Sequence, residues 1–451
     1  MSSRVTVFSK LTAVSSKPVR SGMTHTLSAM DHAMGFHSLH IVFYYENEDN
    51  LLESFELDSL RESLCEVLTE YPTMTGRLAR DGDGNWEVRC NDAGVRVIKA
   101  NVDTTLSEWL QSASASEQAR LIAWDHMPDD PSTWSPFRIQ INSFKDGGLA
   151  IGLSCNHMLA DLTCAASFFN SWTETHRQKP ITHPPFFNPL PKPHTNSPAA
   201  TTTMSPPQAQ TQTPSSTNMA STTFKFSSSI IKQCLFNIHE TCPNATPFDF
   251  LSALFWTRIA RLKPPKNHDQ SHYSLSICTD FRKLLKPSLP IGYFGNALHF
   301  STLSVEDMES GDLGDIASAV HSHLAGLAEE EIWSSIERFE TQKESGGKFR
   351  SPSCMYGPEL TCVSMEHMVE AESSLLYAAM FSNNEKPVHV SCHMGKVEGE
   401  GLIMVMPSSE GGLARTVKVM LPEEELAELS KDEAILQLEP TVILAGCGAE
   451  H

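Results

Sequence analysis

The fold is decided by the stretch Leu149-Ala-Ile-Gly-Leu-Ser-Cys-Asn-His157-Met-Leu-Ala-Asp161. Residues 149–154 form a short apolar run that follows the turn-forming residues Asp146-Gly147-Gly148, which predicts a buried strand. After Asp161, apolar residues recur at helical spacing, which predicts a helix with one buried face. His157 and Asp161 therefore lie where a strand leads into a helix. At such junctions a rigid scaffold often presents reactive side chains.

Length and charge limit the functions that the chain can have. With 451 residues it is long enough for two ordinary domains, and 40% hydrophobic and 20% charged residues are typical of a globular protein. The formal net charge is -20, from 54 acidic and 34 basic residues. This excess argues against nucleic acid as a partner and against electrostatic adhesion to an anionic membrane. An acidic ligand would need a locally basic site.

Cysteine usage and the N-terminal segment indicate the compartment. The 11 Cys are scattered, with no C-x-x-C pair, and predict reduced, mostly buried thiols. Residues 1–8 lack the apolar core of a signal peptide, and no apolar run approaches the roughly 20 residues of a spanning helix. We therefore expect a cytoplasmic protein without a transmembrane segment, or one that another component holds at a membrane.

A change of composition divides the chain into two halves. Residues 179–222 are rich in Pro, Ser, Thr and Gln, which predicts a linker that cannot bury a core. We expect an N-terminal lobe over residues 1–178 and a C-terminal lobe over residues 223–451, where part of about 370–400 could pack with the N-terminal lobe. Strands alternate with helices in both halves, which predicts an α/β fold with mixed sheets. A cleft between the halves is the expected binding site.

Periodicity predicts the main elements. Helices are expected at residues 57–71, 162–172, 229–239, 246–260, 312–329 and 421–429. Strands are expected at residues 5–10, 39–45, 86–91, 95–98, 149–154, 223–226, 274–279, 388–394, 401–406 and 415–420.

Two patterns resemble metal sites, and we reject both. Asp81, Asp83 and Asn85 match the start of a calcium loop, but a tryptophan stands where that loop needs glycine, and flanking helices are missing. His389 and His393 share one face of an expected strand, but a zinc site would need more ligands at metal spacing. We assign these histidines to packing or to the surface, and predict no metal and no tightly bound cofactor.

The whole chain resembles the BAHD acyltransferase superfamily, whose signature is H-x-x-x-D. The matching segments are His157 with Asp161, residues 27–31, residues 60–78 with Tyr71-Pro72 and Gly76-Arg77-Leu78, residues 90–95, the helix around Trp256, and Tyr293-Phe-Gly-Asn296. The resemblance implies a chloramphenicol-acetyltransferase-like fold, with two similarly folded lobes around a central channel. Acyl-CoA, as substrate or ligand, would enter from one face and the acceptor from the other.

The resemblance also implies roles for the signature residues. His157 would be the general base that takes the proton of an acceptor hydroxyl or amine as it attacks the thioester carbonyl. Hydrogen-bond donors would stabilise the resulting oxyanion. Asp161 would turn away from the reaction and brace the junction through a salt bridge. The alternative is that His157 is a structural histidine kept for packing.

One departure from the family lies near the C-terminus. BAHD enzymes carry Asp-Phe-Gly-Trp-Gly before a Lys-Pro, whereas Lys386-Pro387 follows Phe381-Ser-Asn-Asn384-Glu385 here. By the resemblance, Arg282 loses its aspartate partner and must point to solvent or to another carboxylate. Asn384 aligns with the tryptophan whose N–H lies near the oxyanion in some members. An amide can also donate there, although losing one such donor typically costs about a hundredfold to a thousandfold in rate.

Keeping H-x-x-x-D without the second motif is similar to the eceriferum/glossy group of plant cuticular wax formation. Residues 88–102, 144–154, 356–361 and 422–429 agree with that group. The resemblance implies a monomer on the cytosolic side of the endoplasmic reticulum that helps a 3-ketoacyl-CoA synthase elongate very-long-chain acyl-CoAs, without acyl transfer of its own. The well-kept Tyr293-Phe-Gly-Asn296 favours the alternative, an active acyl-CoA-dependent O- or N-acyltransferase with His157 as base and Asn384 as oxyanion donor.

Overall fold

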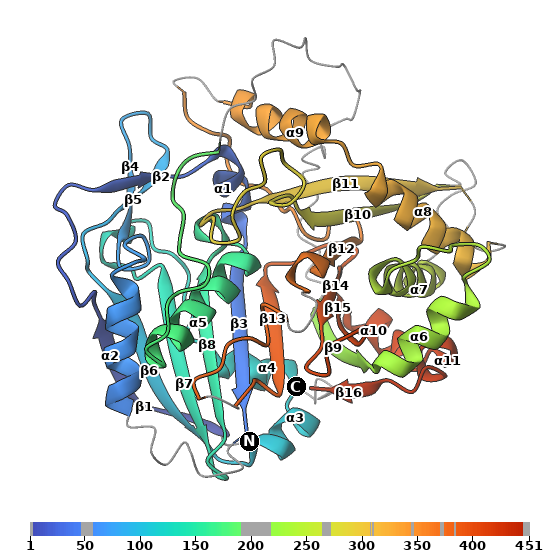
Figure 1. Ribbon diagram of the computed structural model, residues 1–451, viewed down its shortest axis with the longest axis horizontal. Coiled ribbons are helices and arrows are strands. Elements are labelled where there is room, and N and C mark those ends of the chain that lie inside the picture. Colours follow the sequence, from blue (N-terminus) through green and yellow to red (C-terminus); the bar gives the residue numbers. More distant parts are fainter. Residues whose placement is uncertain are drawn as a thin grey trace.

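The computed structural model describes residues 3–46, 57–190, 218–263, 272–306, 308, 311–343, 347–369, 374–382 and 385–444. These residues form two lobes that lie side by side, and each lobe is built on a mixed β-sheet (Figure 1). The predicted α/β class with two lobes is therefore confirmed. None of the helices within the described ranges is long and apolar enough to cross a membrane.

The N-terminal lobe contains a six-stranded sheet in the order β1-β6-β7-β8-β3-β13. Its strands are β1 Val5–Ala13, β3 Ser38–Tyr45, β6 Val95–Val102, β7 Phe137–Phe144, β8 Leu149–Asn156 and β13 His389–Gly395. Neighbours are antiparallel except β6 and β7. β13 comes from the C-terminal half of the chain and pairs with β3, so it lies between the two lobes (Figure 1). A small sheet of β2 Thr24–Thr26, β5 Trp86–Arg89 and β4 Arg77–Arg80 completes this lobe.

Helices pack on this sheet and bury its apolar face. They are α1 Ala29–Ala33, α2 Leu57–Leu68, α3 Leu106–Ser112, α4 Ala115–Gln118 and α5 Leu162–His176. α5 is buried along its first twelve residues, because its apolar side chains meet both α2 and β3. Phe169 of α5 stacks on Phe43 of β3 with ring centroids 4.0 Å apart. The helix that follows His157 is thus fixed firmly within the core.

The C-terminal lobe contains a seven-stranded sheet in the order β11-β10-β12-β14-β15-β9-β16. Its strands are β9 Met219–Phe226, β10 Tyr273–Asp280, β11 Leu298–Val305, β12 Thr361–Ser364, β14 Leu402–Pro407, β15 Arg415–Pro422 and β16 Thr441–Ile443. Its helices are α6 Ser228–Asn237, α7 Pro247–Leu262, α8 Leu313–Ala325, α9 Glu329–Thr341, α10 Glu423–Leu429 and α11 Glu433–Leu436. α6, α7 and α8 cover the side away from the N-terminal lobe (Figure 1).

Several boundaries differ from the sequence-based expectations. β9 begins at Met219 rather than at residue 223, because its pairing with β15 extends from Phe226 back to Met219. The short strands β12 and β16 were not expected, since three or four residues carry too little periodicity to be recognised. The eight-residue strands β7 and β11 were missed as well. Capping residues predicted the ends of helices more reliably. α7 begins at Pro247, and Thr246 and Asp249 form the capping box at its N-terminus.

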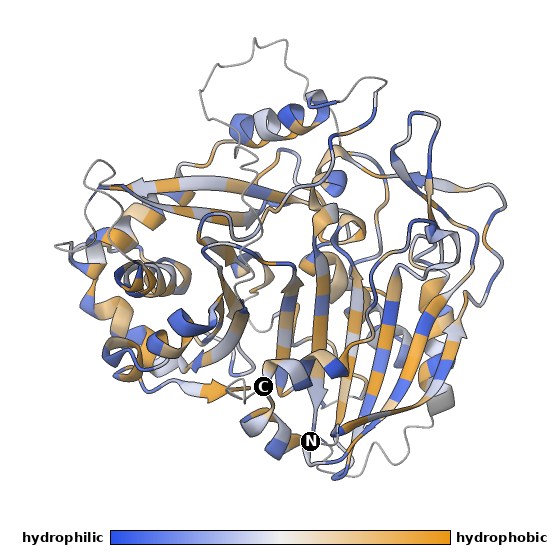
Figure 2. Cartoon of the chain, turned by 180° about the vertical axis from the view of Figure 1, so that it is seen from behind, coloured by the Kyte–Doolittle hydropathy of each residue, from blue (hydrophilic) through white to orange (hydrophobic). Residues whose placement is uncertain are grey.

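The hydropathy pattern follows from these layers. Several strands of the six-stranded sheet carry alternating hydrophobic and hydrophilic bands (Figure 2). β6 illustrates the alternation, with Val95 and Val97 buried and Arg96 exposed between them. β3 and β8 are instead buried along their whole length, because β13 and β7 flank them and helices cover them.

A buried arginine fixes the loop before β6. Arg77 donates from Nη1 to the carbonyl of Gly94 at 2.9 Å and from Nη2 to that of Ala93 at 2.9 Å. Gly94 has φ +87°, and a Cβ there would lie 2.5 Å from Thr12 Cγ2 and 2.7 Å from the carbonyl oxygen of Ala13. Both Gly76-Arg77-Leu78 and the segment ending at Gly94 therefore serve the scaffold.

We predict that Gly94→Ala lowers the free energy of unfolding by about 2 kcal/mol or more, because a left-handed backbone and a steric clash add up. Chemical denaturation measures the change. The control is Gly82→Ala, since a Cβ at Gly82 meets no atom within 4 Å. Equal losses in the two variants would contradict this account.

Candidate active site

His157 begins a 3₁₀ turn, His157–Leu159, directly after β8, and it is fully buried. Its backbone is held on both sides. The N–H of His157 donates to the carbonyl of His37 at 3.0 Å, and its carbonyl accepts from Asn296 Nδ2 at 2.8 Å. The position of the imidazole is thus set by contacts with both lobes.

The imidazole of His157 faces a phenol. Its Nε2 lies 3.1 Å from the hydroxyl of Tyr356, and the two rings stack with centroids 5.8 Å apart. Burial lowers the pKa of His157, although its own backbone carbonyl and the Asp161 carboxylate partly oppose the shift. Burial raises the pKa of Tyr356 well above its usual value. At neutral pH a neutral imidazole and a neutral phenol therefore share this contact, so the Tyr356 hydroxyl occupies the hydrogen-bonding position of Nε2.

A second histidine holds the backbone next to Tyr356. Tyr356 belongs to the segment between α9 and β12, and the N–H of Met355 donates to His37 Nε2 at 2.8 Å. His37 Nδ1 in turn donates to the carbonyl of Gly395 at 3.1 Å. Burial, and then repulsion from His157, lowers the pKa of His37 to about 3. A neutral His37 therefore joins the 3₁₀ turn η1 Met34–Phe36, which it follows, to β13 and to the Tyr356 segment.

The cavity beside His157 is narrow. Its volume is about 310 Å³, counting the part that is open to solvent. The enclosed part amounts to only about 20 Å³, far below the roughly 300–1,000 Å³ that small-molecule sites commonly have. Its lining includes Thr163, Cys278, Tyr356, His367 and Met394.

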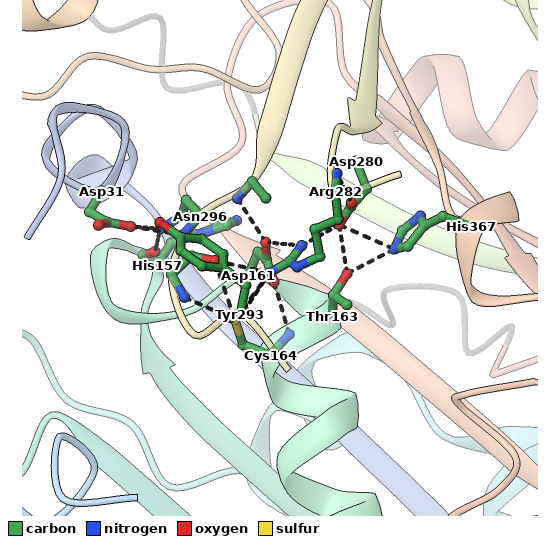
Figure 3. A network of polar contacts seen from close by, with 12 residues as sticks. Asp31, His157, Asp161, Thr163, Cys164, Asp280, Arg282, Tyr293, Asn296 and His367 are labelled. Carbon is green, nitrogen blue, oxygen red and sulfur yellow. Dashed lines mark hydrogen bonds and ion pairs between the residues drawn. The ribbon is translucent and has the colours of Figure 1, made fainter. Parts of the chain in front are cut away.

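Arg282 is the centre of a buried ionic network (Figure 3). It is 0% exposed, and its guanidinium binds both carboxylate oxygens of Asp161, at 2.9 and 3.1 Å. Nη1 also pairs with Asp280. Nη2 donates to the carbonyls of Tyr293 and Gly295 at 3.0 and 3.1 Å. Of the two directions left open by the sequence, solvent or another carboxylate, Arg282 takes the second.

Asp161 combines this ion pair with a helix cap. It is the N-cap of α5, where Oδ1 accepts from the N–H of Cys164 at 2.9 Å, and Oδ2 accepts from the N–H of Ala297 at 3.1 Å. Burial would raise the pKa of Asp161, but the charge and hydrogen bonds of Arg282 outweigh it and lower that pKa. Both carboxylate oxygens of Asp161 are therefore occupied by Arg282 and by backbone N–H groups.

Phe381, the first residue at the place of the lost second motif, lies apart from this network. Phe381 packs in the N-terminal core, with its ring centroid 5.1 Å from that of Trp172 and 5.7 Å from that of Tyr45. An apolar ring at this place cannot pair with Arg282, and Phe381 packs in the aromatic core instead. Asn384, the expected oxyanion donor, lies outside the described residues.

The retained Tyr293-Phe-Gly-Asn296 segment has a structural role. Backbone N–H and Nδ2 of Asn296 both donate to Asp31 Oδ1 at 2.8 Å, while Nδ2 also donates to the carbonyl of His157 (Figure 3). Asp31 also completes the capping box of α1 with Ser28. The segment thus ties α1 and the His157 turn to the C-terminal lobe, with or without catalysis.

A further histidine lines the same cavity. His367 Nε2 lies 2.8 Å from the hydroxyl of Thr163 and 3.4 Å from Asp280 Oδ2 (Figure 3). Burial lowers the pKa of His367, and the carboxylate of Asp280 opposes that shift. Sequence reasoning missed both His367 and Tyr356. Tyr356 contacts a residue 199 positions away, and no local pattern marks such a contact.

Comparison with known proteins identifies the family. The sequence model described as "Transferase family" matches residues 3–436. The chain belongs to this family, that of the BAHD acyltransferases. It is 28% identical over 411 residues to a hydroxycinnamoyltransferase of Narcissus pseudonarcissus, covering 86% of this chain and 90% of the relative. It is 26% identical over 419 residues to Protein ECERIFERUM 2 of Arabidopsis thaliana, covering 90% and 92%.

Solved structures of low sequence identity share the fold of this BAHD chain. The crystal structure of vinorine synthase matches with a TM-score of 0.72 and 20% identity, covering 96% of this chain and 98% of that one. F. graminearum TRI101, complexed with coenzyme A and deoxynivalenol, matches with a TM-score of 0.69 and 13% identity, covering 93% and 100%.

We predict that Arg282→Met lowers the free energy of unfolding by about 3–5 kcal/mol, because it leaves Asp161 and Asp280 buried without a cation. Denaturant titration measures the loss. Lys431→Met is the matched control, since Lys431 forms an exposed ion pair with Glu428 and its removal should have little effect. A loss no larger than that of the control would contradict the structural role.

The buried histidines predict an acid-sensitive fold. Burial lowers the pKa of His37, His40 and His389 to about 3. Between pH 6.5 and 3 the unfolded chain binds protons that the folded chain does not, so stability falls as pH falls. Each histidine contributes about 1 kcal/mol of loss between pH 7.5 and 5.5. Guanidinium denaturation at these two pH values checks this, and an unchanged midpoint would contradict it.

Proposed function

We propose that this BAHD protein assists a 3-ketoacyl-CoA synthase in elongating very-long-chain acyl-CoAs for cuticular wax, without acyl transfer at His157. The observation that carries the proposal is the Tyr356 hydroxyl at 3.1 Å from His157 Nε2, in a site where His157 is 0% exposed. The similarity to Protein ECERIFERUM 2 and the loss of the second motif support it. The protein would act at the cytosolic side of the endoplasmic reticulum.

The Tyr356 hydroxyl occupies the position that an acceptor hydroxyl or amine would need beside Nε2. A general base must lie about 2.6–3.2 Å from the proton that it abstracts. Tyr356 already holds a hydroxyl at that distance, and the backbone N–H of Met355 anchors the segment on His37. An acceptor would have to displace a buried phenol before it could reach Nε2. A protein that binds acyl-CoA or its partner without transfer has no need of that opening.

A second function is favoured by the state of the base. His157 is neutral, its Nε2 faces a hydroxyl, and the Asp161–Arg282 pair that braces its junction is intact. If Tyr356 moved aside, an acceptor O–H or N–H could give its proton to Nε2 as its oxygen or nitrogen attacked the thioester carbon. The tetrahedral intermediate would then expel the coenzyme A thiolate, which takes the proton back from His157. The hydroxycinnamoyltransferase relatives support this alternative.

One pair of measurements separates the two functions. In a host that co-expresses the chain with a 3-ketoacyl-CoA synthase, we expect His157→Ala to produce the same very-long-chain acyl lengths as wild type. Exposed His126 provides the control, as His126→Ala. In parallel, purified wild type is offered hydroxycinnamoyl and very-long-chain acyl-CoAs with alcohol and amine acceptors, and we expect no ester or amide.

The results have opposite meanings for the two functions. If His157→Ala abolishes chain extension while His126→Ala preserves it, the helper role without chemistry is wrong. If purified wild type forms a product and His157→Ala does not, the acyltransferase is the correct function.

A further inference from the structure

A second cluster of basic side chains is buried between the lobes, away from the Arg282 network. Lys418 of β15 is 3% exposed, and its Nζ lies 2.6 Å from Nδ1 of His393 in β13. β13 and β3 place His40 opposite His393 in register, and His389 lies further along β13. Sequence analysis assigned His389 and His393 to packing or the surface and gave Lys418 no role. His389 and Lys418 are buried and His393 is half-buried where the two sheets meet, so packing is the assignment that fits these histidines.

Among the described residues, no carboxylate compensates the charge of this cluster. Lys225 of β9 is the next cation, and it donates to Ser409 Oγ at 3.0 Å. Within the described part of the chain, no carboxylate forms an ion pair with Lys418 or Lys225. Burial lowers the pKa of Lys418 to about 7, and nearby Cys392 opposes the shift only in part. Lys418 further lowers the pKa of His40, His389 and His393. In a chain of net charge -20, a buried basic group without an acidic neighbour is an exception.

Several polar atoms on the strands near Lys418 have no partner among the described residues, and one of them, on Ser154, lies opposite His40 in the ladder of β3 and β8. Nδ1 of His40, Nε2 of His389, Oγ1 of Thr416 and Oγ of Ser154 are buried without a hydrogen bond in the part of the chain that the structure describes. Buried polar atoms are normally satisfied, so an unpaired group on both facing sheets indicates a ligand or water between them. Metal binding does not account for it, since no metal-ligand cluster occurs among the described residues and Lys418 is itself a cation.

Methionine side chains lie next to Lys418 on the same face of the sheet. Met404 lies beside Lys418 in the ladder of β14 and β15, and Met406 lies beside Thr416. Met420 is two residues further along the same face of β15. Methionine side chains are unbranched and adapt to irregular ligands. A cationic head surrounded by methionines matches a molecule with one anionic end and an apolar body.

We propose that this interlobe cluster binds the carboxylate of an amphiphilic anion of the fatty-acid class, with the carboxylate at Lys418 and His393 and the tail along the methionines. The carboxylate supplies the missing charge and accepts hydrogen bonds from the unpaired donors. The inference is independent of the function proposed for His157. It requires that binding return a proton to Lys418, because a carboxylate stabilises the ammonium form.

Isothermal titration of the full chain at pH 8 tests this, with octanoate, octanol and inorganic phosphate as probes, each in two buffers of different ionisation enthalpy. We expect octanoate to bind at least tenfold more tightly than octanol and phosphate, with uptake approaching one proton. Lys418→Met should weaken octanoate binding at least tenfold and remove the proton uptake. Exposed Lys431→Met is the control and should change neither.

Each other outcome overturns the inference. Equal binding of octanoate and octanol would remove the role of the carboxylate, and equal binding of phosphate would remove that of the tail. Wild-type affinity in Lys418→Met, or absence of proton uptake by wild type, would remove the role of Lys418. If Lys418→Met fails to fold, the comparison of octanoate with octanol and the proton count on wild type still decide the matter.

Discussion

The junction between the lobes depends on the ion pair between Arg282 and Asp161. Arg282 follows β10 of the C-terminal lobe, and Asp161 caps α5 of the N-terminal lobe, so the pair joins the two sheets at the strand–helix turn that carries His157. Burying both ions is costly, and the arrangement is stable because Asp280 and two backbone carbonyls satisfy the remaining donors of Nη1 and Nη2. The aspartate of H-x-x-x-D thus belongs to the scaffold rather than to the reaction.

The same burial sets both the protonation state and the neighbour of the His157 imidazole. It keeps the imidazole neutral, and it brings the Tyr356 hydroxyl onto Nε2. The H-x-x-x-D signature therefore indicates how the turn at His157 is held. The contacts of Asp161, Asn296 and Asp31 fix this turn between the two lobes. Whether a substrate reaches Nε2 depends on Tyr356, which the signature does not contain. This is why a preserved H-x-x-x-D is compatible with both functions.

Local patterns predicted the fold well and the site only in part. The run before His157, the apolar spacing after Asp161 and the Thr246-Pro247 cap each identify an element, because neighbouring residues determine them. The partners of Arg282 and the hydroxyl facing His157 come from segments over a hundred residues away. Strand alternation correctly put His389 and His393 on one face, but only the pairing of β13 with β3 makes that face an interior.

The two buried basic side chains of the lobe interface, Arg282 and Lys418, differ in whether carboxylates compensate their charge. This difference decides which of them can change its protonation state. Arg282 has two carboxylates, and although burial opposes it, its pKa lies well above the usual value, so it stays charged in every state of the protein. Lys418 has no carboxylate among the described residues, and burial brings its pKa to about 7. A group that titrates near neutral pH changes its charge when its surroundings change, whereas a fully compensated one does not. The charge of the interface is therefore fixed at Arg282 and adjustable at Lys418.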